Sequence, residues 1–463
     1  MTIATRNPAT GELVREYEPH SAAAVERKLE AAHGAAARSW RRRSGAERVG
    51  PLRRAAGILD SEARSWAERM ALEMGKPVAQ GVAEAGKCAL ACRFFAEHAE
   101  KFLAPERGAT EHESWVRYEP LGVVLAVMPW NFPLWQVFRF AAPALAAGNV
   151  GLLKHASNVP ACALAIEELL ARAGFPDGCF ATLLVESGAV AAVIADPRVA
   201  AVTLTGSEGA GAAVGREAGA RLKKVVLELG GSDPFLVLPS ADLERAVATA
   251  VRARTLNSGQ SCIAAKRFIV HRGIYDAFLE RFIDGMSRLR VGDPMDEATE
   301  VGPLATASIR DQLAEQVERS VAAGARVALG GAPIDRPGWF YRPTVLVDAP
   351  AGSLARTEEL FGPVATIVRV DDLDQAIAVA NETRFGLGAA AWTNDAGERE
   401  RLIAELEAGS VFVNGMVASD PRLPFGGVKA SGHGRELSRH GLLEFVNVKT
   451  VSTWGQFPIS SSD

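Results

Sequence analysis

The sequence has 463 residues and a formal net charge of −4, with 48% hydrophobic and 23% charged residues. That length is enough for two or three domains, and the composition is that of ordinary soluble globular proteins. The charge gives no reason to expect a nucleic acid or an anionic membrane as partner, and no apolar run is long enough to span a bilayer.

The five cysteines are odd in number, and their spacing suggests neither a disulfide framework nor a zinc site. No metal site is therefore expected. Cys88 and Cys92 stand four residues apart on a predicted helix, where packing explains them. No signal peptide is evident in residues 1–10, and the cysteine pattern favours a reducing cytoplasm.

The chain begins with a helical region from Ser21 to about Phe102, in which apolar positions recur every three or four residues. Ser114 to Tyr118 predicts an edge strand that projects from the body. Apolar runs then alternate with amphipathic stretches such as Ala161–Ala173. The predicted strands are Gly122–Met128, Val150–Lys154, Phe180–Val185, Val199–Leu204 and Lys224–Leu229.

This alternation predicts parallel βαβ units and a doubly wound sheet. No G-x-G-x-x-G follows the first strand, so the fold alone leaves the cofactor open. The second half repeats the alternation and predicts a second α/β domain, before a β segment at Leu443–Trp454. Its predicted strands are Phe268–His271, Arg326–Leu329, Pro343–Val347, Ala365–Val370, Ala389–Trp392 and Ser410–Asn414, and its helices are Tyr275–Leu289, Ile309–Ala322 and Glu398–Leu406.

A lone cysteine, Cys262, follows the short run Gly259–Ser261. A thiolate is the nucleophilic form of cysteine, and small residues before it allow backbone N–H groups to approach a bound carbonyl. Taken alone, the pattern also fits a buried, inert cysteine, which is the commoner case.

Two upstream stretches complete a candidate catalytic set. Glu228 precedes two glycines and would act as general base, although a solvated glutamate at a strand end fits the same pattern. Asn131 offers a side-chain amide, although it also fits a turn beside Pro133. Nucleophile, base and donor together are what covalent catalysis at a carbonyl requires.

These motifs, together with Glu359–Pro363 and Pro424–Gly427, resemble the aldehyde dehydrogenase superfamily, which oxidises aldehydes with a nicotinamide cofactor. The resemblance runs from Asn7–Glu12 to Gly441 and beyond. Within the superfamily the chain is most similar to the succinate-semialdehyde dehydrogenases, on residues 259–267 and 425–438.

The resemblance implies that Cys262 forms a thiohemiacetal with the aldehyde, that Asn131 and the Cys262 backbone N–H stabilise its oxygen, and that Glu228 activates the hydrolytic water. It also implies two doubly wound α/β domains and a small β arm. The expected bounds are 1–101 and 121–229 for the cofactor-binding domain, 230–420 for the catalytic domain, and 102–120 and 436–463 for the oligomerisation arm. That arm would pair with the C-terminal strand of another subunit in a homodimer or homotetramer.

Residues Gly206–Gly211 begin a helix after a predicted strand, and a helix N-terminus favours a pyrophosphate. A capped helix with packing glycines explains the same pattern. The resemblance assigns Ser207 to the cofactor phosphates, Glu359 to the nicotinamide ribose and Phe361 to the ring. Trp130 fits either the same cleft or a core position. The full predicted cofactor-binding set is Trp130, Lys154, Ser157, Gly206, Ser207, Gly211, Leu229, Glu359 and Phe361.

Residues 154–157 indicate which cofactor is preferred. Many NAD-using relatives carry a glutamate at the position of Ser157, where it holds the adenosine ribose. Ser157 removes a negative charge where NADP carries its 2′-phosphate, and Lys154 adds a positive one. We therefore expect NADP to be preferred and NAD to be tolerated.

Two residues indicate the substrate. Arg139 matches a carboxylate-binding arginine of the succinate-semialdehyde dehydrogenases, and Ser419 matches a serine that binds the same group. Some members have another arginine six residues before the cysteine, where this chain has Leu256. A surface or interdomain ion pair is the alternative for Arg139.

The sequence thus predicts an NAD(P)-dependent aldehyde dehydrogenase that converts succinate semialdehyde to succinate. One alternative is an enzyme of the same fold that oxidises a broad range of uncharged aldehydes. Another is an enzyme that transfers the acyl group to coenzyme A, but Glu228 favours water as the acceptor. A cofactor-free cysteine hydrolase and a non-catalytic relative are the alternatives from other classes.

Overall fold

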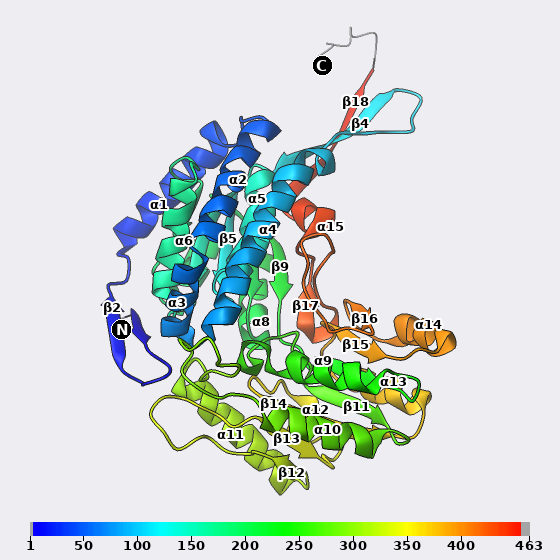
Figure 1. Ribbon diagram of the computed structural model, residues 1–463. Helices are drawn as coiled ribbons and strands as arrows, with labels where there is room; N and C mark the ends of the chain where they lie inside the picture. The colour runs from blue at the N-terminus through cyan, green and yellow to red at the C-terminus, as the bar shows by residue number, and fades with distance from the viewer. Residues whose placement is uncertain (1–2, 455–463) are drawn as a thin grey trace.

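The computed structural model describes residues 3–454, which form two large sheets of six and seven strands, a three-stranded sheet and an N-terminal hairpin (Figure 1). This arrangement confirms the predicted α/β fold class. Residues 1–2 and 455–463, which fall within the predicted cofactor domain and arm, lie outside the described residues. Within 3–454, no helix is long and apolar enough to cross a membrane.

The first sheet has the strand order β17-β9-β8-β5-β6-β7. Its central strands are mostly apolar and almost wholly buried, as parallel strands covered on both faces are. All its pairs are parallel except β17 with β9. The strands are β5 (Val123–Met128), β6 (Val150–His155), β7 (Phe180–Thr182), β8 (Val199–Thr205), β9 (Lys224–Glu228) and β17 (Gly432–His433).

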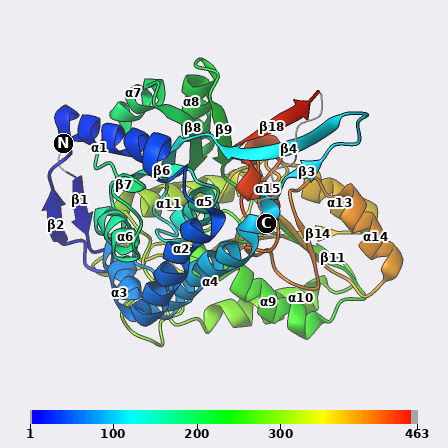
Figure 2. The same cartoon turned by 90° about the horizontal axis from the view of Figure 1, so that it is seen from above.

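Helices lie on both sides of this sheet. Figure 2 places α7 and α8 on one side of its strands and α2, α3 and α4 on the other. The helix α4 packs against α2, α3 and α5, and α5 packs against β5 and β6. The bounds are α1 (Ala22–Gly34), α2 (Gly45–Ser61), α3 (Ala63–Met74), α4 (Val78–Phe102), α5 (Trp135–Ala146), α6 (Pro160–Arg172), α7 (Val190–Ala195) and α8 (Glu208–Gly219).

The strand order creates a topological switch point between β5 and β8. From β5 the chain moves outward through β6 to β7, and it then returns to β8 on the other side of β5 and continues to β9. In open α/β sheets, ligands bind in the crevice outside the carboxyl ends of the strands at such a point. Trp130 follows β5 and Gly206 follows β8, so both stand at this crevice.

The second sheet has the order β12-β13-β14-β11-β10-β15-β16 and is parallel except for β12. Its strands are β10 (Pro234–Val237), β11 (Arg267–His271), β12 (Arg326–Leu329), β13 (Thr344–Val347), β14 (Val364–Val370), β15 (Ala389–Trp392) and β16 (Val411–Val413). The helices of this half are α9 (Leu243–Thr255), α10 (Tyr275–Ser287), α11 (Ala307–Ala322), α12 (Leu354–Thr357), α13 (Leu373–Asn381) and α14 (Ala396–Glu405). The strand β10 was not predicted from the sequence, although it lies inside the sheet, between β11 and β15.

The arm is a three-stranded sheet of the order β18-β4-β3 that projects from the body (Figure 1). It contains β3 (Glu106–Arg107), β4 (Glu113–Pro120) and β18 (Val446–Thr453), and α15 (Ser438–Leu443) leads into it. Within the chain, β18 pairs along the whole of one edge of β4, whereas β3 pairs on the other edge only with Trp115 and Val116. The expected pairing of the arm strand with the C-terminal strand of another subunit stays a prediction.

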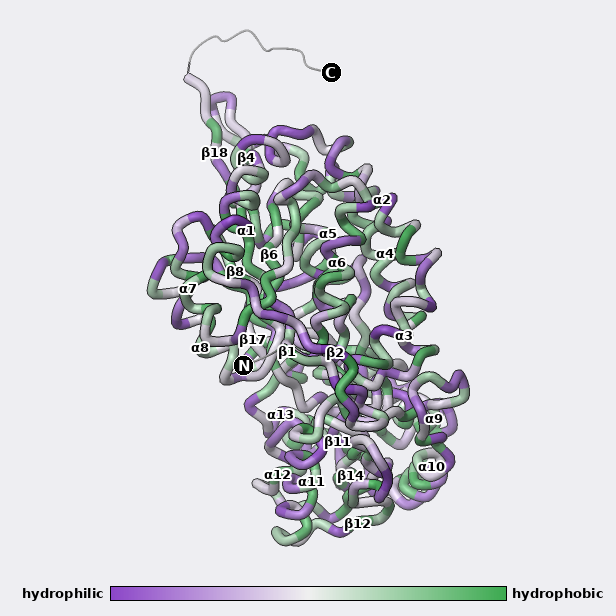
Figure 3. Tube along the Cα trace, turned by 90° about the vertical axis from the view of Figure 1, so that its left-hand side faces the viewer, coloured by the Kyte–Doolittle hydropathy of each residue, from purple (hydrophilic) through white to green (hydrophobic). Residues whose placement is uncertain are grey.

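The chain passes from the first large sheet to the second between Glu228, the last residue of β9, and Pro234, the first residue of β10. The predicted domain bounds stay a prediction, and they leave unassigned the short strand β17, which joins the first sheet. The sequence reading also missed the hairpin of β1 (Ile3–Arg6) and β2 (Leu13–Tyr17). Figure 3 shows apolar stretches concentrated in the interior elements and hydrophilic stretches at the periphery.

Candidate active site

The loop that carries Cys262 is held in an uncommon backbone conformation. Asn257, Ser258 and Gly259 all have positive φ angles, of 56°, 56° and 76°. A side chain at Gly259 would lie 2.2 Å from the carbonyl oxygen of Gly362, so only glycine fits there. The strain is local to the residues that precede the nucleophile, as is common at functional sites.

Two buried cations tie this loop down. The Arg254 Nη2 donates to the carbonyl of Gly259 at 2.7 Å, and the Lys266 Nζ donates to those of Ser261 and Cys262 at 2.9 and 2.7 Å. Burial lowers the pKa of Arg254 to about 9 and also lowers the pKa of Lys266. Charge-assisted bonds of this kind fix the position of the cysteine backbone.

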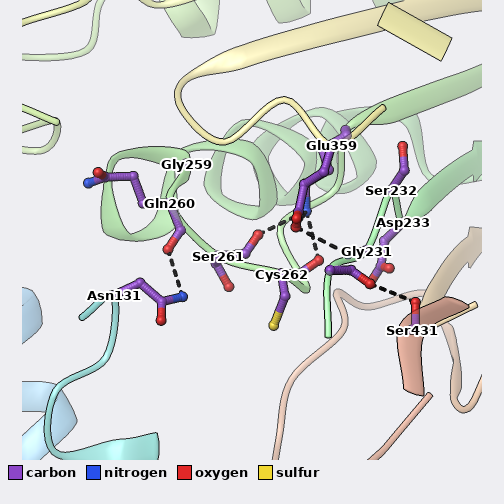
Figure 4. A network of polar contacts seen from close by, with 12 residues as sticks. Asn131, Gly231, Ser232, Asp233, Gly259, Gln260, Ser261, Cys262, Glu359 and Ser431 are labelled. Atoms are coloured by element: carbon purple, nitrogen blue, oxygen red, sulfur yellow. Dashed lines mark hydrogen bonds and ion pairs between the residues drawn. The ribbon is translucent and has the colours of Figure 1, made fainter. Parts of the chain in front are cut away.

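Cys262 and Asn131 share the wall of a cavity of about 460 Å³. The Asn131 Nδ2 donates to the Gln260 carbonyl at 3.2 Å, and the Asn257 side chain donates to the Asn131 carbonyl at 2.7 Å. Figure 4 shows the bond between Asn131 and Gln260 beside the Cys262 side chain, whose sulfur carries no drawn contact. The loop therefore places the predicted nucleophile and the predicted amide donor together.

The Cys262 thiol rests in a protonated form. Burial raises its pKa to about 12, against the opposing charges of Arg139 and Lys266. Its backbone N–H makes no hydrogen bond within residues 3–454. That N–H and the second N–H of the Asn131 amide are the donors available to an oxyanion at this wall.

Glu228 ends β9 immediately before Leu229 and Gly230, which line the cavity. Its own carboxyl is only 2% exposed and has no hydrogen bond within residues 3–454. Burial raises the pKa of Glu228 well above its usual range, and the nearby Glu436 raises it further. A general-base role requires this carboxyl to turn toward the cavity and contact water.

The structure brings Glu436 into this group, a residue to which sequence reasoning assigned no role. It forms a buried ion pair with Arg139. Arg139 is 2% exposed, donates to the Thr205 hydroxyl at 3.2 Å and lies over the Phe425 ring at 4.5 Å. The only available signal was that Glu436 belongs to the 425–438 stretch on which the resemblance rests.

Arg139 does not line the cavity that contains Cys262 and Asn131. Its guanidinium is engaged by Glu436, which corresponds to the ion-pair alternative for this residue. Ser419, the other predicted substrate residue, is 7% exposed, and its hydroxyl accepts from Lys87 at 2.7 Å and from the Trp135 ring N–H at 3.0 Å. The structure therefore connects Ser419 to Lys87, which the sequence did not single out.

Six of the nine predicted cofactor residues line the cavity with Cys262, and two of them frame it. Trp130 and Phe361 meet edge to face, with ring centroids 5.7 Å apart. Glu359 accepts from the Gly231 N–H at 3.1 Å and lies 3.4 Å from the Lys266 ammonium. The six are Trp130, Gly206, Ser207, Leu229, Glu359 and Phe361.

This cavity fits a dinucleotide. It opens at the switch point of the first sheet, where the N-terminus of α8 meets it through Gly206 and Ser207. A side chain at Gly209 would meet nothing within 4 Å, so the first turn of the helix is open to a phosphate. The G-x-G-x-x-G motif is absent, but a strand end followed by an open helix N-terminus, which that motif usually provides, is present here.

The other three predicted cofactor residues do not line the cavity. A side chain at Gly211 would lie 2.5 Å from Leu229, so this glycine allows α8 to pack closely. Lys154 is buried near the end of β6, and burial lowers its pKa. Ser157 is exposed in the turn that follows. Within residues 3–454, the Lys154 ammonium has no ion pair or hydrogen bond.

Comparison with known proteins agrees with this geometry. The aldehyde dehydrogenase family model matches residues 1–451. The chain is 57% identical over 457 residues to the protein named succinate-semialdehyde dehydrogenase [NADP(+)] 1 of Mycobacterium tuberculosis strain H37Rv, covering 97% of this chain and 99% of the relative. It is 56% identical over 457 residues to the succinate-semialdehyde dehydrogenase [NADP(+)] of Mycolicibacterium paratuberculosis, covering 97% and 96%.

A solved structure shows the same fold. The succinic semialdehyde dehydrogenase from Streptococcus pyogenes, in complex with NADP+, superimposes with a TM-score of 0.95 at 37% identity, covering 97% of this chain and 99% of that one. The family predicted from the motifs is thereby confirmed. The chain belongs to the aldehyde dehydrogenase family.

Proposed function

We propose that this protein oxidises succinate semialdehyde to succinate with NADP, and that NAD is tolerated in its place. The observation that carries the proposal is the placement of Cys262 beside Asn131 on the wall of the cavity at the switch point. The names of the mycobacterial relatives and of the streptococcal structure support the choice of substrate and cofactor.

In the proposed reaction, the Cys262 thiol gives its proton to solvent water, and the thiolate sulfur attacks the aldehyde carbon. The C=O π electrons move to the oxygen, to which Asn131 and the Cys262 backbone N–H donate. Bound NADP supplies the acceptor for the hydride of that carbon. Glu228 then takes a proton from water, whose oxygen attacks the resulting thioester, and the sulfur leaves with the electrons of the C–S bond.

Gly206 and Ser207 would hold the cofactor phosphates, and Glu359 and Phe361 would hold the nicotinamide end. Lys154 supports the preference for NADP because its ammonium has no partner within residues 3–454 and stands three residues before Ser157. No carboxylate occupies residues 154–157, and burial lowers the pKa of His155 to about 4, so this histidine is uncharged. A 2′-phosphate would meet one positive charge and no negative one there.

One observation favours the alternative of a broad aldehyde dehydrogenase. Arg139 is paired with Glu436, and Leu256 replaces the second arginine, so both expected cation positions are unavailable to a substrate acid. Initial rates of NADPH and NADH formation with succinate semialdehyde and uncharged butanal distinguish the two. We expect the highest kcat/KM with succinate semialdehyde and NADP. A preference for butanal or for NAD contradicts the proposal.

We also propose that the arm formed by β3, β4 and β18 mediates a homodimer or homotetramer, because β18 pairs within residues 3–454 on one edge only. Light scattering on the purified protein tests this, since a monomer contradicts it. The cytoplasmic location stays a prediction.

A further inference from the structure

A second cavity, of about 610 Å³, is lined by Lys87 on α4, by Phe132 and Trp135 near the start of α5, and by Leu256. Phe132 follows Asn131 in the chain, and Leu256 precedes Asn257, which bonds to Asn131. Asn131 itself lines the first cavity, so neighbouring residues of the same two segments contribute to both cavities.

Lys87 presents a positive charge in this second cavity. Its ammonium donates to the Ser419 hydroxyl at 2.7 Å and lies 4.3 Å from the centre of the Trp135 ring. Within residues 3–454, no carboxylate pairs with it. Three glutamates also line the cavity, and each is engaged: Glu84 pairs with Lys76, Glu297 pairs with Arg64, and Glu300 accepts the N–H of Arg290. Glu84 also accepts the N–H groups of Leu134 and Trp135, and the nearby Asp420 pairs with Arg422.

Hydrogen-bond donors outnumber acceptors at this point. The Ser419 oxygen accepts from both Lys87 and Trp135, so its two lone pairs are occupied and its own O–H must donate. Within residues 3–454, that O–H has no acceptor, and the Lys87 ammonium retains two further N–H groups. A carboxylate supplies the acceptor oxygens that this arrangement lacks.

The charge of Arg139 acts on both Lys87 and Cys262. Burial and then Arg139 lower the pKa of Lys87, whereas burial raises the pKa of Cys262 and Arg139 opposes that rise, so both residues lie near this guanidinium. Glu84, three residues before Lys87 on the same helical face, bonds to the start of α5 and fixes the lysine relative to Trp135.

We infer that Lys87 and Ser419 bind the carboxylate of the substrate in this second cavity, and that Lys87 takes the place of the cation missing at Leu256. The inference rests on the proposed function and deepens it, because it names the residues that select an acid aldehyde. Arg139 then serves as a positioning residue held by Glu436.

Kinetics of four proteins test this: wild type, Lys87→Met, Lys87→Arg and the matched control Lys101→Met. Lys101 is exposed on the same helix, α4, and lines neither cavity. We expect Lys87→Met to lower kcat/KM for succinate semialdehyde about 10- to 100-fold, through KM, and to change butanal oxidation by less than about 3-fold. Lys87→Arg should restore most of the loss, and Lys101→Met should change either substrate by less than about 3-fold.

Equal losses on both aldehydes in Lys87→Met, an unaffected KM for the acid, or an equal loss in Lys101→Met would overturn the inference. A second experiment, inhibition of butanal oxidation by succinate, distinguishes failure of the carboxylate-site inference from failure of the proposed function. If the wild type fails to oxidise succinate semialdehyde, the proposed substrate is wrong, yet succinate should still compete with butanal in the wild type and not in Lys87→Met. Absence of that competition in the wild type contradicts the carboxylate site itself.

Discussion

The cofactor cavity and the second cavity differ in how their charged side chains are paired. In the cofactor cavity, Glu359 lies against Lys266 and Glu208 pairs with Arg384. In the second cavity, within the residues described, Lys87 has only the Ser419 hydroxyl and the Trp135 ring as partners. Under the proposed function, the first cavity would hold the reacting carbon and the cofactor, and the second would hold the anionic group of the substrate.

Replacing the proposed nucleophile should have the largest effect. Cys262→Ala removes the sulfur that would attack the aldehyde, so kcat for both aldehydes should fall by at least about 10,000-fold. NADPH formation measures the loss, and cofactor binding followed by fluorescence should be retained. Activity within 100-fold of the wild type would mean that the reaction does not pass through this sulfur.

Asn131→Ala removes one of the two proposed donors to the oxyanion. The expected result is a fall in kcat of about 100- to 1,000-fold that is equal for succinate semialdehyde and butanal, because both form the same oxyanion. Thermal unfolding of the variant controls for its fold. A loss confined to KM would assign Asn131 to substrate binding instead.

Arg139→Met tests whether the buried arginine binds substrate or positions Glu436. Removal of one partner from a buried ion pair destabilises a protein by about 3–5 kcal/mol, because the other charge is left unpaired. We expect that loss in urea unfolding, with similar kinetic effects on both aldehydes. A rise in KM for the acid alone, with unchanged stability, would favour the carboxylate role predicted from the sequence.

Much of the fold could be predicted because its signals are local. The apolar runs at β5, β6 and β8 are buried on both faces, and such runs are visible without a structure. The strand β10 was missed because it is four residues long and begins at Pro234, a residue that usually counts against a strand. The strand β2 was missed because its residues are mostly exposed.

The candidate site was predictable where function depends on a local motif. Cys262 and Asn131 stand in such motifs, and the structure brings them together. The environment of Arg139 was not predictable, because its partner Glu436 lies far along the chain and only tertiary packing joins them. Lys87 resembled any lysine of a polar helix face, since nothing in its neighbourhood in the sequence shows that Ser419 approaches it.

Ser157→Glu should change cofactor choice. A carboxylate near the 2′-phosphate site repels NADP and can accept hydrogen bonds from the ribose of NAD, so the ratio of kcat/KM for NADP to that for NAD should fall by about 10- to 100-fold. Ser157→Ala is the matched control and should leave the ratio within about 3-fold. An unchanged ratio in Ser157→Glu would place the adenosine ribose elsewhere.

The smallest expected effect is a pH dependence. Burial, with a smaller contribution from Arg139, lowers the pKa of Lys87 to about 8, so the ammonium is charged below that pH and loses its proton above it. The KM for succinate semialdehyde should therefore rise several-fold between about pH 7 and pH 9, while the KM for butanal stays level. The other groups that face Lys87 are Glu84, Cys88, Arg139 and Asp420. In Lys87→Arg the rise should disappear, and its persistence there would assign it to another group.

A crystal structure of Cys262→Ala with NADP and succinate semialdehyde is the most direct test, because the unreacted aldehyde remains bound. We predict the aldehyde oxygen within hydrogen-bonding distance of the Asn131 amide and the carboxylate on Lys87 and Ser419, with the pair of Arg139 and Glu436 intact. A carboxylate bound to Arg139 with Glu436 displaced would contradict this division of roles.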